Sequence, residues 1–199
     1  MIAVLRSELH RSLSIRSSWI ILALFAGLAA FTGWLSEDFW TLFAGLGAFG
    51  IAIVLTSQHY QHHTIILTFL GRPQRLVVLA VQCLVAILFG LALGVVSGFP
   101  IVGGHPGQYL TTLAAIPLIA VFGVANATIV RRPMWLLGGY LGWLVIAEGM
   151  IGRLEEPLPF TSFLFASIGQ PRFQLALLGW TAGSLALAAW SVRRDVTGG

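Results

Sequence analysis

The chain has 199 residues, of which 57% are hydrophobic and only 9% are charged, with a formal net charge of +4. Soluble domains carry about 25% charged residues, and a soluble chain this apolar would expose aggregating surface. The composition therefore excludes a water-soluble enzyme and indicates an integral membrane protein. All eleven basic residues are arginine, and they stand at the ends of apolar blocks. That position argues against nucleic-acid binding and marks membrane topology.

The first 18 residues form a basic, amphipathic segment. Leu5, Leu9 and Leu13 recur at helical spacing among arginines, so residues 1–18 are predicted to form a helix lying in the membrane interface. A cleaved signal peptide is the alternative interpretation. It is disfavoured because the polar segment is long and contains Glu8, and because the apolar run that follows exceeds a typical signal core.

Six apolar blocks of helical-span length follow, and none shows the alternation of a β-barrel strand. They predict a single all-α transmembrane domain over residues 1–199. The blocks cover residues 19–35, 39–56, 76–97, 109–130, 134–151 and 173–192.

The arginines predict the orientation of these spans. Six spans place both termini on one side, and nine arginines then share that side: Arg6, Arg11, Arg16, Arg72, Arg75, Arg131, Arg132, Arg193 and Arg194. Only Arg153 and Arg172 lie opposite. The positive-inside rule therefore predicts a multi-pass protein of the cell membrane with both termini in the cytoplasm.

Two connections are long enough to have a role of their own. Residues 57–75 form a cytoplasmic segment that is first polar, then apolar, then basic. Residues 152–172 form an outer connection whose semi-apolar middle, residues 160–168, is too short to span. We expect this middle part to be a re-entrant or surface-lying helix packed against protein.

Glycine motifs in the spans have two interpretations. Gly45, Gly47 and Gly50 spell G-x-G-x-x-G, but a dinucleotide site also requires a βαβ unit around it. Close helix packing is the better interpretation, and the same is expected of Gly90 and Gly94. A set of three glycines in the fifth block is assigned a packing role as well: Gly138, Gly139 and Gly142. For these last two sets a dimer contact is the alternative. No Walker A motif is possible, because it requires lysine.

A histidine group occupies the cytoplasmic segment. His59, His62 and His63 have spacing that places imidazoles on one helix face, and imidazole is a common metal ligand. No carboxylate or cysteine accompanies them, so a polar helix that is exposed or contacts a partner is favoured over a metal site, and we assign no metal.

Three polar residues inside the spans are candidates for the translocation path or for buried polar contacts. Glu148 lies within the fifth block, where an ionisable group is a functional-site hypothesis by default. A shallow glutamate that reaches outer water or pairs with Arg153 is the favoured alternative. Gln82 and Asn126 are expected to form interhelical hydrogen bonds rather than to bind substrate.

One segment resembles a known family. Residues 59–82 read HYQHHTIILTFLGRPQRLVVLAVQ, which resembles the region after the second span of ABC-2 type transporter permeases, particularly those of actinobacterial drug exporters. Tyr60, Thr64 and Ile65 match the front of the family pattern. Arg72 and Pro73 match its middle, and Arg75 stands where the family has an arginine. The six-span layout and the N-terminal helix also resemble this family, whose fold is that of type V exporters.

The resemblance implies a partner and a mechanism. In such permeases this segment is a coupling helix that docks on a cytoplasmic ABC ATPase subunit, which holds ATP and Mg²⁺, so the chain itself would need no cofactor. His59, His63 and Gln82 stand where the family has Glu, Gly and Lys, which puts the local ion pairs in doubt. One explanation is a second permease, of the same or a different chain, that keeps the standard motif.

Three functional hypotheses result. The first is the non-enzymatic permease subunit of an exporter for a hydrophobic or amphiphilic drug, antimicrobial peptide or lipid, with path walls that include Phe43, Phe49, Phe122 and Trp143. The second is a non-transporting scaffold or immunity protein that binds a partner or peptide in the membrane. The third is an ion carrier or membrane-embedded enzyme built around Glu148, which lacks a second ionisable group at similar depth.

Overall fold

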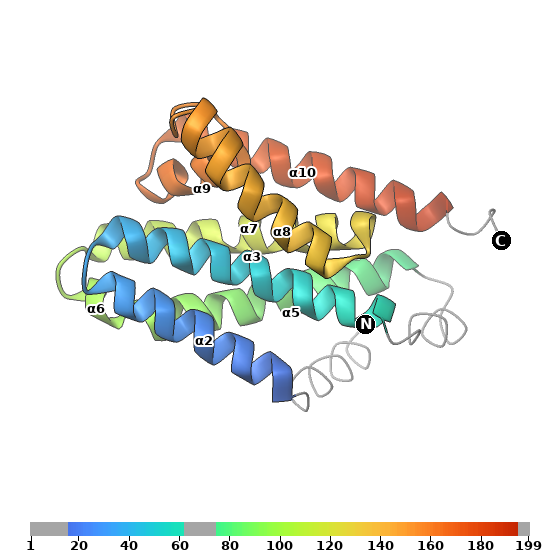
Figure 1. Cartoon of the computed structure of the whole chain (residues 1–199), viewed down its shortest axis with the longest axis horizontal. Helices are drawn as coiled ribbons and strands as arrows, with labels where there is room; N and C mark the ends of the chain where they lie inside the picture. Colours follow the sequence, from blue (N-terminus) through green and yellow to red (C-terminus); the bar gives the residue numbers. More distant parts are fainter. Residues whose placement is uncertain (1–15, 62–74, 195–199) are drawn as a thin grey trace.

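A computed structural model describes residues 16–61 and 75–194 of the chain, and within these ranges every regular element is helical (Figure 1). The elements are α2 (Arg16–Gly33), α3 (Glu37–Gln61), α5 (Arg75–Ser97), α6 (Phe99–Val102), α7 (Pro106–Val130), α8 (Pro133–Trp143), the π-helix η1 (Leu144–Ile151), α9 (Pro159–Ser167) and α10 (Pro171–Arg194).

Five of these helical stretches are long and apolar enough to cross a membrane. They are Glu37–Ser57, Leu76–Ser97, Pro106–Val130, Pro133–Ile151 and Pro171–Arg194. They correspond to the second to sixth predicted blocks, so the chain is an all-α, multi-pass membrane protein. The first predicted block lies in α2, whose apolar stretch Leu22–Gly33 is shorter than a full span.

The helix boundaries have local causes in the sequence. Helices α7, α8, α9 and α10 all begin at a proline, whose fixed φ suits a first helical turn and whose missing N–H would be unpaired there anyway. Arg131 ends α7 in the left-handed conformation, with φ of 58°. This conformation turns the chain directly into α8, which explains why two spans need only two connecting residues.

The bundle has two chemically different ends. The basic end holds Arg131, Arg132, Arg193 and Arg194, together with the start of α5. The acidic end holds Glu37, Asp38, Glu155 and Glu156. At the acidic end, Gln108 of α7 donates to Asp38 of α3 at 3.4 Å, and His105 Nε2 lies 3.7 Å from a carboxylate oxygen of Glu37.

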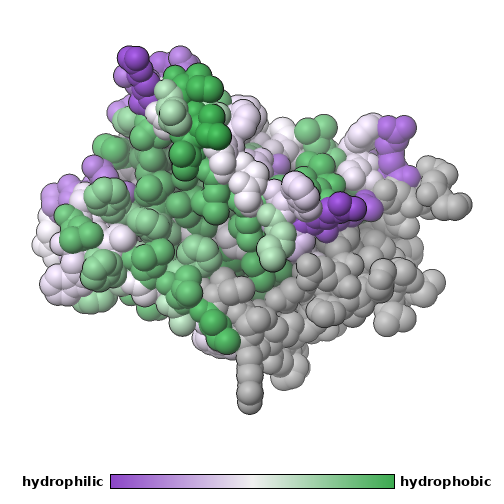
Figure 2. Space-filling model, viewed as in Figure 1, coloured by the Kyte–Doolittle hydropathy of each residue, from purple (hydrophilic) through white to green (hydrophobic). Residues whose placement is uncertain are grey.

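Helix α3 is the centre of the bundle, packed against α2, α5 and α7, whereas α8 and α10 lie at its edge. In the α3 span 72% of the residues are buried, against 22% in α10 and 11% in α8–η1. Figure 1 shows α8 crossing the bundle obliquely on the side of α10. Figure 2 shows that much of the visible surface is apolar, which suits contact with lipid or with another membrane chain.

The glycines of α3 are packing positions, as the sequence predicts. A Cβ on Gly47 would lie 2.9 Å from Leu93 Cδ1 of α5, and one on Gly50 would lie 3.3 Å from the Phe25 ring of α2. Helices can approach closely here because these residues have no side chain. Gly94 of α5 packs in the same way against Ile116 of α7.

The packing against other helices of this chain that the sequence predicts for Gly138, Gly139 and Gly142 is wrong, whereas a contact with a second copy stays a prediction. Nothing lies within 4 Å of a Cβ built on any of them. The reason is the position of α8 at the edge of the bundle, where these glycines border open space instead of a neighbouring helix.

The outer connection does contain the predicted short helix. Helix α9 is packed into the protein, with Phe160 and Phe163 each 1% exposed. Thr111 of α7 donates a hydrogen bond to the carbonyl oxygen of Ser167, which fixes the other end of α9. Of the predicted interfacial helix, residues 1–15 lie outside the described residues, as do residues 62–74 of the coupling segment.

Candidate functional site

Among the acidic and basic side chains whose burial the structure describes, Glu148 alone is fully buried. It belongs to η1, a π-helical stretch in which Gly152 N–H bonds to the carbonyl oxygen of Ala147 at 2.8 Å. π-Helical turns are rare and are frequent at functional sites. The position of Glu148 therefore requires a structural explanation.

Four hydrogen bonds hold the Glu148 carboxylate. Oε1 accepts from the backbone N–H of Phe160 and from Trp143 Nε1, each at 3.1 Å. Oε2 accepts from the backbone N–H of Thr161 at 2.5 Å and from Thr161 Oγ1 at 2.8 Å. The carboxylate thus caps the N-terminus of α9, where free N–H groups and the helix dipole favour a negative charge.

The structure contradicts the favoured prediction for Glu148, which is contact with outer water or an ion pair with Arg153. The side chain has no exposed surface, so it does not reach outer water, and no ion pair joins it to Arg153 in the structure's described part. Arg153 is exposed, in a left-handed turn with φ of 47°. The residue before α9, Leu158, has no side chain that can cap the helix, and Glu148 fills that role from another element.

A second polar contact joins α7 and α8. Tyr140 Oη donates to Asn126 Oδ1 at 2.9 Å, and Asn126 Nδ2 donates to the carbonyl oxygen of Phe122 at 2.8 Å. Because a carbonyl oxygen only accepts, the second bond fixes which amide atom is nitrogen. The Tyr140 ring also makes edge contacts with Phe49, Phe122 and Phe160.

Gln82 lies at a third buried polar position, in α5. It is 7% exposed, and its Nε2 has no hydrogen-bond partner within the described ranges. The hydroxyls of Thr56 and Ser57 on α3 are also buried, and neither has a partner in the described part of the chain. Ala48 faces Gly90 across the antiparallel pair α3–α5, and the same register places Thr56 at the level of Gln82.

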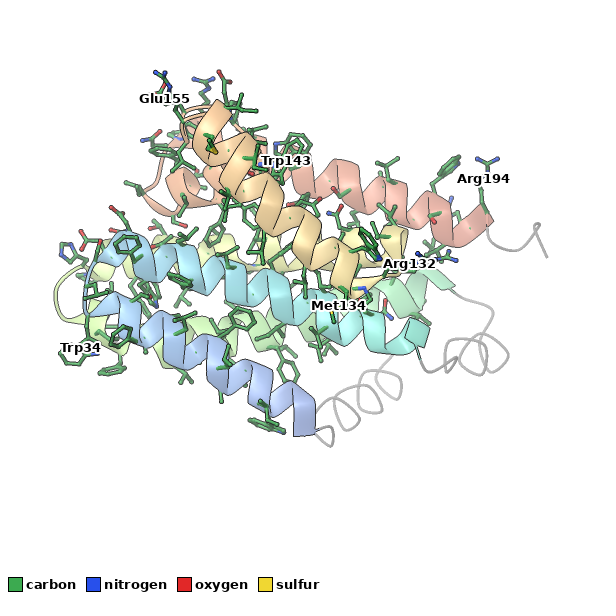
Figure 3. The ribbon with its side chains drawn as sticks, in the orientation of Figure 1. Trp34, Arg132, Met134, Trp143, Glu155 and Arg194 are labelled. Carbon is green, nitrogen blue, oxygen red and sulfur yellow. The ribbon has the colours of Figure 1, made fainter. Side chains whose placement is uncertain are left out.

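A cavity of about 420 Å³ lies between α7, α8 and α10. Phe122 and Asn126 form its floor, Trp143 and Tyr140 its α8 wall, and Trp180 and Ser184 its α10 wall. Both indole N–H groups are already bonded: Trp143 to Glu148, and Trp180 to the carbonyl oxygen of Pro157 at 2.8 Å. Figure 3 labels Trp143 at the end of α8, where η1 begins.

The predicted aromatic wall is divided between two cavities. Phe122 and Trp143 line the α7–α8–α10 cavity, whereas Phe43 and Phe49 line a smaller one of about 150 Å³ beside α2. A third, wholly apolar groove of about 420 Å³ lies between α2 and α5, where Trp19 and Phe89 contribute to it. Among these three cavities, only that of α7, α8 and α10 is lined by both an amide and a hydroxyl side chain.

Most of the predicted coupling residues cannot be described structurally. His59 and Tyr60 belong to the last turn of α3, and Arg75 begins α5. His62, His63, Thr64, Arg72 and Pro73 lie outside the described residues. Within the described part no group of three or more possible metal ligands is present.

Sequence reasoning missed Thr161 and Tyr140, the partners of Glu148 and Asn126. No local pattern marks them, because Thr161 is 13 positions from Glu148 and Tyr140 is 14 positions from Asn126, and the two residues of each pair lie in different helices. Comparison with models of known protein families and with curated proteins finds no match to this chain.

Proposed function

We propose that the chain is the membrane-spanning permease subunit of an ABC exporter for a hydrophobic or amphiphilic compound, with ATP hydrolysed by a separate cytoplasmic subunit. The observation that carries the proposal is the sequence between α3 and α5, with its match to the coupling segment of ABC-2 type permeases. Tyr60, Thr64, Arg72, Pro73 and Arg75 carry that match.

The arrangement of the helices supports this proposal. Helix α3 ends and α5 begins at the basic end of the bundle, where α7 meets α8 and where α10 finishes. If the basic end faces the cytoplasm, as the arginines predict, residues 62–74 connect two spans on the side where an ATPase would bind. The largely unburied α8–η1 and α10 leave membrane-depth surface for a second permease.

The test is affinity purification of the tagged chain in mild detergent, followed by mass spectrometry and an ATPase assay. The proposal requires a nucleotide-binding subunit in stoichiometric amount and vanadate-sensitive hydrolysis. Arg75→Glu or a bulky residue at Thr64 should uncouple hydrolysis from export without reducing expression. Arg172→Glu at the acidic end is the matched charge-reversal control and should retain coupling.

A non-transporting scaffold or immunity protein is the second candidate, because His59, His63 and Gln82 depart from the coupling pattern. If the chain is such an immunity protein, its protection of the cell must persist when any associated ATPase is inactivated. Purification of the chain alone, without ATPase activity, would favour it over the exporter.

The third candidate, an ion carrier or enzyme centred on Glu148, has weaker support. Three of the four hydrogen bonds of the carboxylate hold α9 in place and the fourth joins it to Trp143 of α8. A proton relay usually needs further ionisable groups nearby. Normal activity in a Glu148→Gln variant would eliminate this candidate.

A further inference from the structure

We propose that the cavity between α7, α8 and α10 binds an uncharged amphiphile that has an aromatic or alkyl body and one hydrogen-bond acceptor. The proposal that this ligand is the exported cargo rests on the proposed function. The proposal that the cavity binds such a ligand rests on its geometry alone. The size, the polarity and the position of the cavity each restrict the ligand.

The size of the cavity suits a small molecule. Its floor runs along α7 from Phe122 to Val130, a distance of about 12 Å at 1.5 Å per residue. Its volume of about 420 Å³ lies within the range of small-molecule sites.

The lining determines the polarity of the ligand. None of the lining residues carries a formal charge, so an ion would lose its hydration without compensation. The Asn126 amide uses its oxygen for Tyr140 and one N–H for Phe122. Its second N–H and the Ser184 hydroxyl have no partner in the part of the chain that the structure describes. These donors favour a carbonyl, ester or ether oxygen on the ligand.

The walls suit a flat or chain-like apolar body. Trp143 and Trp180 contribute indole rings whose N–H groups are already bonded elsewhere, so the rings remain as contact surface. Trp135 is 75% exposed at the basic end of the cavity, and Trp143 is 44% exposed. Because α8 and α10 are membrane-depth helices at the edge of the bundle, the cavity is accessible from the hydrocarbon.

The test uses benzophenone, which is uncharged and has two aromatic rings and one carbonyl, and which crosslinks to nearby C–H bonds under ultraviolet light. The purified full chain in phosphatidylcholine nanodiscs is irradiated with the probe, and labelled peptides are mapped by mass spectrometry. We expect labels to concentrate on the floor and walls of the cavity. If lipid-exposed residues on all helices are labelled as strongly as those of the cavity, the proposal is overturned.

Two neighbouring glycines provide a matched pair of variants. Gly139 lines the cavity and Gly138 does not, although both are exposed on α8 and neither has an atom within 4 Å of a built Cβ. Gly139→Phe should fill the cavity and remove the labelling there, whereas Gly138→Phe should leave it unchanged. Equal effects of the two variants would contradict a small-molecule site.

The hydrogen-bond requirement is tested on the unmodified chain by competition. Dibenzyl ketone and diphenylpropane differ by a carbonyl in place of a methylene, and the ketone should compete about fivefold better for labelling, as one neutral hydrogen bond would give. If the two compounds compete equally well, the proposed requirement for a hydrogen-bond acceptor on the ligand is wrong. The charged probe benzoylbenzoate should not label the cavity.

The two proposals can fail separately. Specific labelling of a chain that copurifies with no ATPase would end the exporter proposal and leave the binding site. If an ATPase is present and Gly139→Phe abolishes labelling but leaves export unchanged, the cargo role of the cavity is wrong while the exporter proposal stands.

Discussion

Thr161 donates two hydrogen bonds to the same carboxylate oxygen of Glu148, one from its backbone N–H at 2.5 Å and one from Oγ1 at 2.8 Å. Phe160 and Trp143 donate to the other oxygen. A carboxylate has about four acceptor positions, so the surrounding protein satisfies it completely. Glu148 is thereby the connection between the end of a span and the buried helix α9.

Glu148→Ala should destabilise the protein by about 3 kcal/mol or more, because it leaves several buried N–H groups without an acceptor. Thermal unfolding in detergent measures this through a thiol-reactive dye, since Cys83 is the only cysteine. Thr161→Val, which removes only the hydroxyl, should cost about 1 kcal/mol. An alanine variant as stable as the parent would show that α9 does not depend on this cap.

Close packing of α3 predicts a large difference between two glycine substitutions. Gly47→Leu should destabilise by about 1–3 kcal/mol, because the new side chain meets Leu93 and Phe25. Gly183→Leu on α10 has open space around it and should change stability by about 0.5 kcal/mol or less. The same dye assay compares them, and similar losses in both would contradict the packing.

The Tyr140–Asn126 contact predicts coupling between two helices. Tyr140→Phe removes the donor to Asn126 Oδ1 and should cost about 1 kcal/mol, close to values for hydrogen bonds between membrane helices. A double-mutant cycle with Asn126→Leu measures the pair. A coupling energy near zero would mean that the residues contribute independently.

The sequence predicts much of this fold because a chain that crosses the membrane needs long apolar helices. The lengths of these helices and the arginines that flank them can be read directly from the sequence. Packing glycines on α3 and the short helix after residue 152 follow from the same reasoning. Proline at the start of four helices also explains their boundaries.

The site is less predictable, because its contacts depend on which helix meets which. Glu148 is visible as a buried carboxylate, but its partner on α9 follows only from the fold. Gly138 and Gly47 are alike in sequence terms, yet one faces open space and the other faces Leu93. That difference comes from the edge position of α8, which no local pattern specifies.

Unpaired buried groups near the basic end predict a stabilising substitution. Thr56 Oγ1 has no hydrogen-bond partner among the residues that the structure describes, so Thr56→Val removes a desolvated hydroxyl while keeping the shape of the side chain. We expect a gain of about 1 kcal/mol in the free energy of unfolding. Thr128→Val is the control, since its hydroxyl bonds the Val124 carbonyl at 2.8 Å and the substitution should not stabilise. A loss in Thr56→Val would indicate a bound water or ligand at this position.

Orientation can be tested with single cysteines in a Cys83→Ala background. Gly104 lies at the acidic end with open space around it, and Arg132 is exposed at the basic end. The arginine distribution predicts that a membrane-impermeant maleimide labels Gly104→Cys in intact cells and Arg132→Cys only after permeabilisation. Arg16→Cys, at the start of α2, should behave like Arg132→Cys, because α2 begins at the basic end and the sequence predicts that it crosses. If Arg16→Cys is labelled in intact cells while Arg132→Cys is protected, α2 does not have the predicted topology, and the six-span layout on which the exporter proposal depends is wrong.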